Sequence, residues 1–167
     1  MFINADEMKS VLYDYQMTQI SEEDNDVILD GIRAAISEAR GYLIAANNRR
    51  ETATLTKQQY RAWRLYDVDT IFSREGEARC PFLTRIVKRI AAYNICELST
   101  PDVILDRVKQ RYDDAILTLR KVAGEGEYVN SRLIIDDADF IEETEQEEDA
   151  LELPIRMVSR RKFNHEF

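Results

Sequence analysis

Histidine is almost absent from this sequence of 167 residues, and the only one is His165. A Ser-His or Cys-His nucleophile pair needs a histidine beside the nucleophile, and many zinc sites use two histidines. The scarcity therefore argues against these hydrolases and against a two-histidine zinc site. An enzyme would have to use carboxylates, and no pair among the many Asp and Glu residues is distinguished by its surroundings. We expect a protein that is not an enzyme.

Cysteine and glycine are also scarce. Cys80 and Cys96 are sixteen positions apart and form no CxxC or CxxH pattern, which predicts two reduced thiols. The five glycines form neither GxGxxG nor GxxxxGKS, so no nucleotide-binding loop is indicated. The segment that contains Asp137 and Asp139 lacks the glycine and the final glutamate of a calcium-binding loop. We expect no cofactor, no metal ion and no small-molecule substrate.

Long apolar runs are missing too. None reaches the roughly 20 residues that span a bilayer, and the first residues lack a basic segment followed by a hydrophobic block. Hydrophobic residues make up 44% of the chain, which suffices for one modest core. We therefore expect one soluble domain in the cytoplasm, with no membrane partner.

Acidic charge is present and is unevenly spread. The net charge is −9, and residues 125–167 contribute −8 of it, from 13 acidic and 5 basic side chains. Ten acids and no base lie between Asp136 and Glu152. Dense like charge resists compaction. The sequence predicts a helical domain over 1–126 and an acidic, extended or partly disordered tail over 127–167.

Apolar residues recur at helical spacing in three segments, which predicts an all-α fold. We expect main helices over about 24–46, 81–98 and 101–123, the last capped by Ser99 or Thr100 and stopped by Gly124. Short helices are expected before residue 21. Residues 47–80 form an irregular insertion with a short helix near 57–65, and "RLII" after Gly126 is a possible short strand. The predicted architecture is a small bundle of three main helices plus short N-terminal helices, with an extended C-terminal tail.

Two groups of basic residues could bind a partner. Arg85, Lys88 and Arg89 share the outward strip of the 81–98 helix, which is either plain surface or a stripe for DNA phosphates or an acidic protein. In residues 60–66, aromatic side chains alternate with arginines, as in single-strand nucleic-acid platforms. The favoured alternative is that these aromatics anchor a long connection to the core while the arginines face water.

Three stretches together resemble one protein family: "MKSVLYDYQMTQIS", "YDVDTIFSREGEARCPFLTRIVKRIAAYNICEL" and "RYDDAILTLRKVAGEGE". The family is that of phage Mu-like small head-to-tail connector, or head completion, proteins, and the match covers about residues 1–127. The opening resembles the family's short helix pair before a capped helix. The matching positions of the other two stretches are Tyr66-Asp67, Ile71-Phe72, Arg79-Cys80-Pro81, Arg111-Tyr112, Ala115, Leu119 and Val122-Ala123-Gly124.

The resemblance implies an all-helical structural subunit without catalysis. Such subunits assemble as a ring of about a dozen copies between the portal and the tail. The implied partners are the portal protein, a tail-side completion protein and other copies of the chain. The implied location is the bacterial host cytoplasm during assembly and then the virion.

The basic and apolar residues supply hypotheses for the contacts of such a ring. Near the end of the tail, Leu153, Ile155, Met157 and Phe163 would make buried contacts, and Arg160, Arg161 and Lys162 would pair with acids on the portal. Arg85, Lys88 and Arg89 would face DNA passing through the channel. The alternative from another class is a small DNA-binding regulatory protein that uses the basic region 49–89, which holds ten Lys and Arg against five Asp and Glu.

Overall fold

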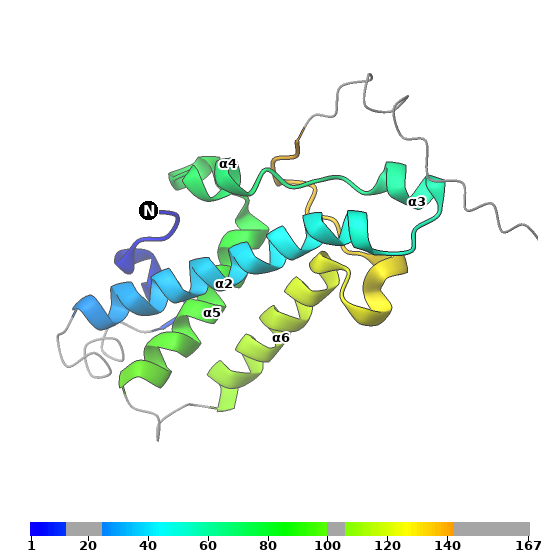
Figure 1. Ribbon diagram of the computed structural model, residues 1–167. Helices are drawn as coiled ribbons and strands as arrows, with labels where there is room; N and C mark the ends of the chain where they lie inside the picture. The colour runs from blue at the N-terminus through cyan, green and yellow to red at the C-terminus, as the bar shows by residue number, and fades with distance from the viewer. Residues whose placement is uncertain (13–24, 100–105, 142–167) are drawn as a thin grey trace, which may run out of the picture.

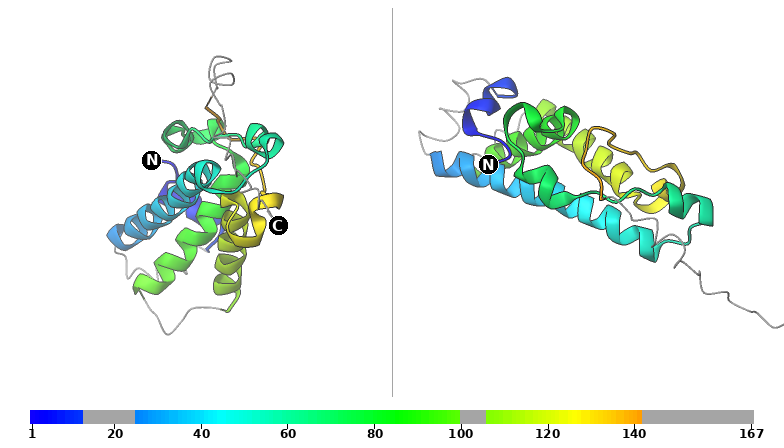
Figure 2. Two further views of the ribbon diagram at one scale, coloured as in Figure 1. Left: turned by 45° about the vertical axis from the view of Figure 1, so that its right-hand side comes forward. Right: turned by 90° about the horizontal axis from the view of Figure 1, so that it is seen from above.

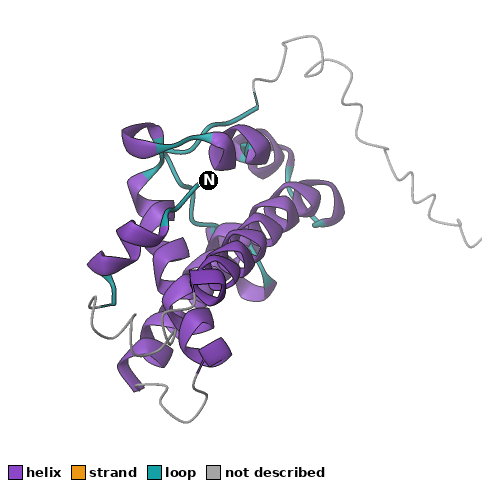
Figure 3. Cartoon of the chain, turned by 90° about the vertical axis from the view of Figure 1, so that its left-hand side faces the viewer, coloured by secondary structure: helices purple, strands orange, loops and turns teal. Residues whose placement is uncertain are grey.

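A computed structural model describes residues 1–12, 25–99 and 106–141 of the chain. Its main elements are three long helices, α2 (Asn25–Thr52), α5 (Pro81–Ser99) and α6 (Asp106–Ala123), and each packs against the other two (Figure 1). The shorter elements are the α-helices α3 (Lys57–Ala62) and α4 (Val68–Ser73) and the 3-10 helices η1 (Ala5–Ser10), η2 (Gly76–Ala78) and η4 (Gly126–Ser131). The predicted all-α fold with three main helices is confirmed, and Figure 3 shows the described residues as helix and loop.

The central helix of the bundle is α5. Its buried side chains occupy more than one side of the helix, because Leu83, Val87 and Ile90 are buried together with Ile86 and Ala91. An apolar arc of this breadth can pack against two neighbouring helices at once. Accordingly, α5 packs on both α2 and α6 (Figure 2).

Gly31 allows α2 and α5 to approach closely. A Cβ atom added to Gly31 would lie 2.6 Å from Cγ1 of Ile95 and 3.1 Å from the Ile95 backbone nitrogen. Gly41, in the same helix, has nothing within 4 Å of such an atom. Close helix packing therefore explains Gly31 and does not explain Gly41.

The end of α6 follows its predicted stop signal. Gly124 has a φ of +62°, the N–H of Glu125 donates to the carbonyl of Arg120, and the N–H of Gly124 donates to the carbonyl of Lys121. This pair of bonds is a Schellman motif, which glycine favours because it has no Cβ atom. The predicted start of this helix at residues 100–101 lies outside the described residues, and Ser99 is the last residue of α5.

The segment 47–80 is more ordered than its sequence indicates. The α2 helix continues to Thr52, and α3, α4 and η2 follow it. The α3 helix begins with a capping box, in which the Gln59 N–H donates to the Thr56 hydroxyl and the Thr56 N–H donates to the Gln59 side chain. This box satisfies two backbone donors that the helix itself cannot pair.

Residues 127–141, which our prediction assigns to the tail, pack on the helical body. Ile135 is buried, its backbone N–H donates to the Tyr66 hydroxyl, and Phe140 forms an isolated antiparallel bridge with Tyr66. The predicted strand in "RLII" is wrong, because residues 132–135 lie in an extended loop without strand pairing. The remainder of the predicted tail, 142–167, lies outside the described residues.

Candidate functional site

A groove with a volume of about 670 Å³ lies where η2 and the first half of α5 meet the end of η1 and one residue of α6. Its lining is basic. The cationic residues in it are Arg79, Arg85, Lys88, Arg89 and Arg111, and the acidic residue is Glu77. We refer to this feature as the basic groove.

Three of these cations come from one face of α5. Arg85, Lys88 and Arg89 are spaced i, i+3 and i+4, which places their side chains on neighbouring turns of one helix face. All three line the basic groove, as the prediction of a shared strip requires. Arg111 comes from α6 and Arg79 precedes α5, and sequence reasoning missed both because only the tertiary fold brings them to this face.

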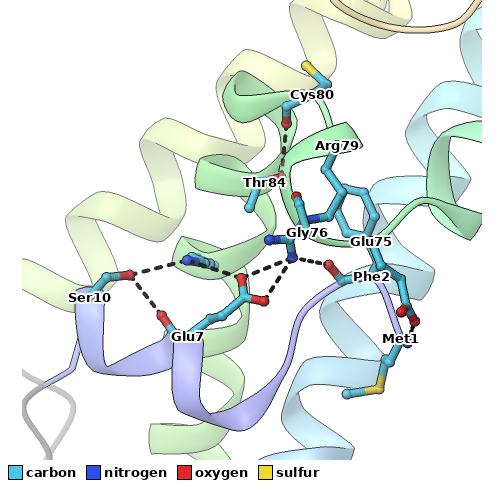
Figure 4. A network of polar contacts seen from close by, with 10 residues as sticks. Met1, Phe2, Glu7, Ser10, Glu75, Gly76, Arg79, Cys80 and Thr84 are labelled. Carbon is cyan, nitrogen blue, oxygen red and sulfur yellow. Dashed lines mark hydrogen bonds and ion pairs between the residues drawn. The ribbon is translucent and has the colours of Figure 1, made fainter.

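Arg79 holds the N-terminal segment onto the start of α5 (Figure 4). Its Nη1 donates to both carboxylate oxygens of Glu7, at 3.0 and 2.9 Å, and to the carbonyl of Phe2, while its Nε donates to the carbonyl of Gly76. The Arg79 side chain is only 12% exposed. Hydrogen bonds between charged partners in such a setting are strong. Arg79 is therefore mainly a structural residue of one groove wall.

Lys88 joins the same network. Its Nζ lies 3.4 Å from Oε2 of Glu7 and 3.4 Å from the hydroxyl of Ser10. Burial alone raises the pKa of Glu7, but the hydrogen bonds and charges of Arg79 and Lys88 outweigh it and hold that pKa below its ordinary value. Glu7 thus stays ionised and offsets part of the positive charge of Arg79 and Lys88.

Arg85, Arg89 and Arg111 have no ion-pair partner among residues 1–12, 25–99 and 106–141. Arg85 places its guanidinium 5.6 Å from the ring centre of Phe82, a cation–π contact that orients the side chain and leaves its donors available. Pro81 and Thr84, from the first turn of α5, also line the groove. The positive end of the α5 dipole therefore adds to the attraction for anions.

The alternation of aromatics and arginines in residues 60–66 is not a stacking platform. Trp63 and Tyr66 are buried, and the indole Nε1 of Trp63 donates to the carbonyl of Ala46. The Arg132 guanidinium lies over both rings, at 4.5 and 4.9 Å from their centres. These rings anchor the connection between α3 and α4 to the core, so the favoured interpretation of the segment is confirmed.

The described part of the chain contains no group of three or more His, Cys, Asp or Glu residues that could hold a metal ion. Cys80 and Cys96 are both buried free thiols. None of the described helices is long and apolar enough to span a membrane. The candidate contact residues Leu153, Ile155, Met157, Arg160, Arg161, Lys162 and Phe163 lie outside the described residues.

Comparisons of the chain with protein-family models, with curated proteins and with solved structures find no match.

Proposed function

We propose that the protein is a structural subunit of a phage head-tail connector that assembles as a ring between the portal and the tail. The observation that supports the proposal is the position of the residues on which the resemblance to the connector family rests. Ile71, Phe72, Ala115 and Leu119 are buried, and Gly124 has the positive φ that ends α6. These five positions specify the fold rather than a reaction, which supports a structural role.

The helical body suits such a subunit physically. A ring subunit needs a rigid wall whose side faces match those of its neighbours. Tyr112 of α6 stacks on Tyr93 of α5 with ring centres 4.2 Å apart, and its hydroxyl donates to Glu38 of α2 at 3.2 Å. The three helices are thus joined by a polar contact in addition to the apolar core, which supports a fixed relative orientation.

Co-sedimentation with the portal tests the proposal. The full chain is mixed with the purified portal ring encoded by the same phage and is spun through a density gradient. We expect the protein to move with the portal, and we expect removal of residues 150–167 to weaken this binding while helicity, measured by circular dichroism, is unchanged. A portal that sediments alone, with the protein folded at the top of the gradient, would contradict the proposal.

The second candidate is a small DNA-binding regulatory protein, and the unpaired Arg85, Arg89 and Arg111 in one groove favour it. Binding through these groups would release counterions, so affinity for duplex DNA would fall steeply with salt. The net charge of −9 works against this candidate, because the field of the whole chain repels DNA. Titration of a labelled duplex at two salt concentrations tests this candidate, and the absence of a steep loss of affinity with salt would contradict it.

A further inference from the structure

The basic groove carries positive charge that the described residues do not neutralise. Glu7 is shared between Arg79 and Lys88, whereas Arg85, Arg89 and Arg111 have no ion-pair partner in the described ranges. Clustered guanidinium groups prefer carboxylate or phosphate ligands, which they bind through paired N–H donors. An anionic partner therefore fits this groove.

The same chain contains a segment of complementary charge. Residues 142–149, EETEQEED, carry six acids and no base. Recognition of acidic peptides by clusters of arginines is a recurrent binding mode. A groove of about 670 Å³ can hold part of an extended peptide. The net charge of −9 repels a DNA duplex and disfavours it as the partner.

The direction of the described chain at residue 141 favours a groove on a second copy as the binding site. The Asp67 N–H donates to the carbonyl of Asp139, and the Ile141 N–H donates to the carbonyl of Leu65. Residues 139–141 therefore run antiparallel to residues 65–67, so the chain at residue 141 heads toward α3. The groove borders η2 and α5, which follow residue 67 in the opposite direction.

We infer that the basic groove binds the acidic segment 142–149 of a second copy of this chain. Arg85, Arg89 and Arg111 pair with its carboxylates, and the first turn of α5 adds its dipole. The inference rests on the proposed ring for the presence of neighbouring copies, which would hold the segment at a high effective concentration.

The first test measures binding of a fluorescent peptide with the sequence of residues 142–149 to the full chain. The receptor is a tail-neutral variant in which the six acids of this segment are replaced by Gln or Asn, so that no copy competes for the groove. A groove variant adds Arg85→Glu, Arg89→Glu and Arg111→Glu to it. The matched control adds Lys57→Glu, Arg61→Glu and Lys109→Glu, which change the charge equally at exposed positions outside the groove.

We expect the peptide to bind the tail-neutral receptor, with an affinity at least about ten-fold lower for the groove variant and within about two-fold for the control. Circular dichroism checks that each variant is folded, and Arg→Gln versions replace any that is not. Absence of peptide binding to the tail-neutral receptor, or an equal loss of peptide affinity in the groove variant and the control, would overturn the inference. Groove-dependent binding of duplex DNA in place of the peptide would assign the groove to nucleic acid and would overturn it too.

The second test asks whether the segment comes from another copy. A variant with an intact groove and a neutral tail is mixed with a variant that has a reversed groove and an intact tail. We expect the mixture to form a complex in sedimentation velocity, whereas each variant alone stays monomeric. Peptide binding without such a complex would contradict docking between copies. Neither test uses the portal, so failure of the connector proposal remains distinguishable from failure of this one.

Discussion

At the scale of single residues, two glycines of α2 have opposite environments and make a matched pair. Gly31→Ala would force a methyl group against Ile95, so we expect a loss of about 1–3 kcal/mol in the free energy of unfolding. Gly41→Ala meets no neighbour and removes the entropic cost of glycine in a helix, so we expect a gain of about 0.5–1 kcal/mol. Urea unfolding of both variants measures the difference. Equal effects of the two substitutions would contradict the packing described between α2 and α5.

Tyr112 provides a residue-scale prediction for alkaline pH. Burial, followed by the charge and hydrogen bond of Glu38, raises its pKa to about 12. In the unfolded chain the pKa is the ordinary value of 10.0, so the stability that this group contributes is complete below pH 10.0 and is lost as the pH rises through about 12.

Ultraviolet titration of the full chain, minus that of Tyr112→Phe, isolates this one phenol. We expect the Glu38→Gln variant to titrate Tyr112 at lower pH than the wild type, but still above 10.0 because burial remains. A wild-type Tyr112 that ionises near pH 10 would contradict the contact among the three helices.

At the scale of elements, η1 depends on Arg79. Replacing Arg79 with Met removes the hydrogen-bond donors to Glu7, Phe2 and Gly76. The partially buried Glu7 carboxylate then has fewer positive partners, so we expect the free energy of unfolding to fall by about 2 kcal/mol. Hydrogen exchange should accelerate at the amides of Val11 and Leu12, which donate to Met8. Arg33→Met, whose exposed side chain pairs only locally with Asp30, is the control. Unchanged exchange in the Arg79 variant would show that η1 does not depend on Arg79.

Lowering the pH tests how η1 is held through Glu7, the ion-pair partner of Arg79. The pKa of Glu7 is below its ordinary value of 4.5, so the stability it contributes is present above that pH and is lost as the pH falls through the folded value. Glu7→Gln removes this contribution. We expect its unfolding free energy to fall less steeply below pH 4.5 than that of the wild type, as measured by urea unfolding at successive pH values.

The long helices could be predicted because their own residues specify them. The apolar arc of α5, the stripe of α2 and the stop at Gly124 are local signals, and each matches an observed element. The predictions that failed concern segments whose conformation is set by tertiary contacts. "RLII" has the apolar character of a strand, but Ile135 is fixed by the Tyr66 hydroxyl, more than sixty residues earlier, rather than by a paired strand.

At the scale of the whole molecule, only part of the candidate site could be predicted. The helical spacing of Arg85, Lys88 and Arg89 places them together, but nothing local indicates that Arg111 of α6 completes the groove. Sequence also cannot show that Glu7 offsets two of the five cations, since that pairing depends on where η1 docks. The sequence shows that residues 49–89 are rich in Lys and Arg. The fold determines which of these side chains are available to a ligand.

The proposed connector role is tested most directly by electron microscopy of the full chain mixed with the portal ring of the phage that encodes it. We expect an added ring of density, stacked on one face of the portal, into which copies of the three-helix body fit side by side. Portal particles without added density, at protein concentrations where the free chain is folded and in excess, would contradict it.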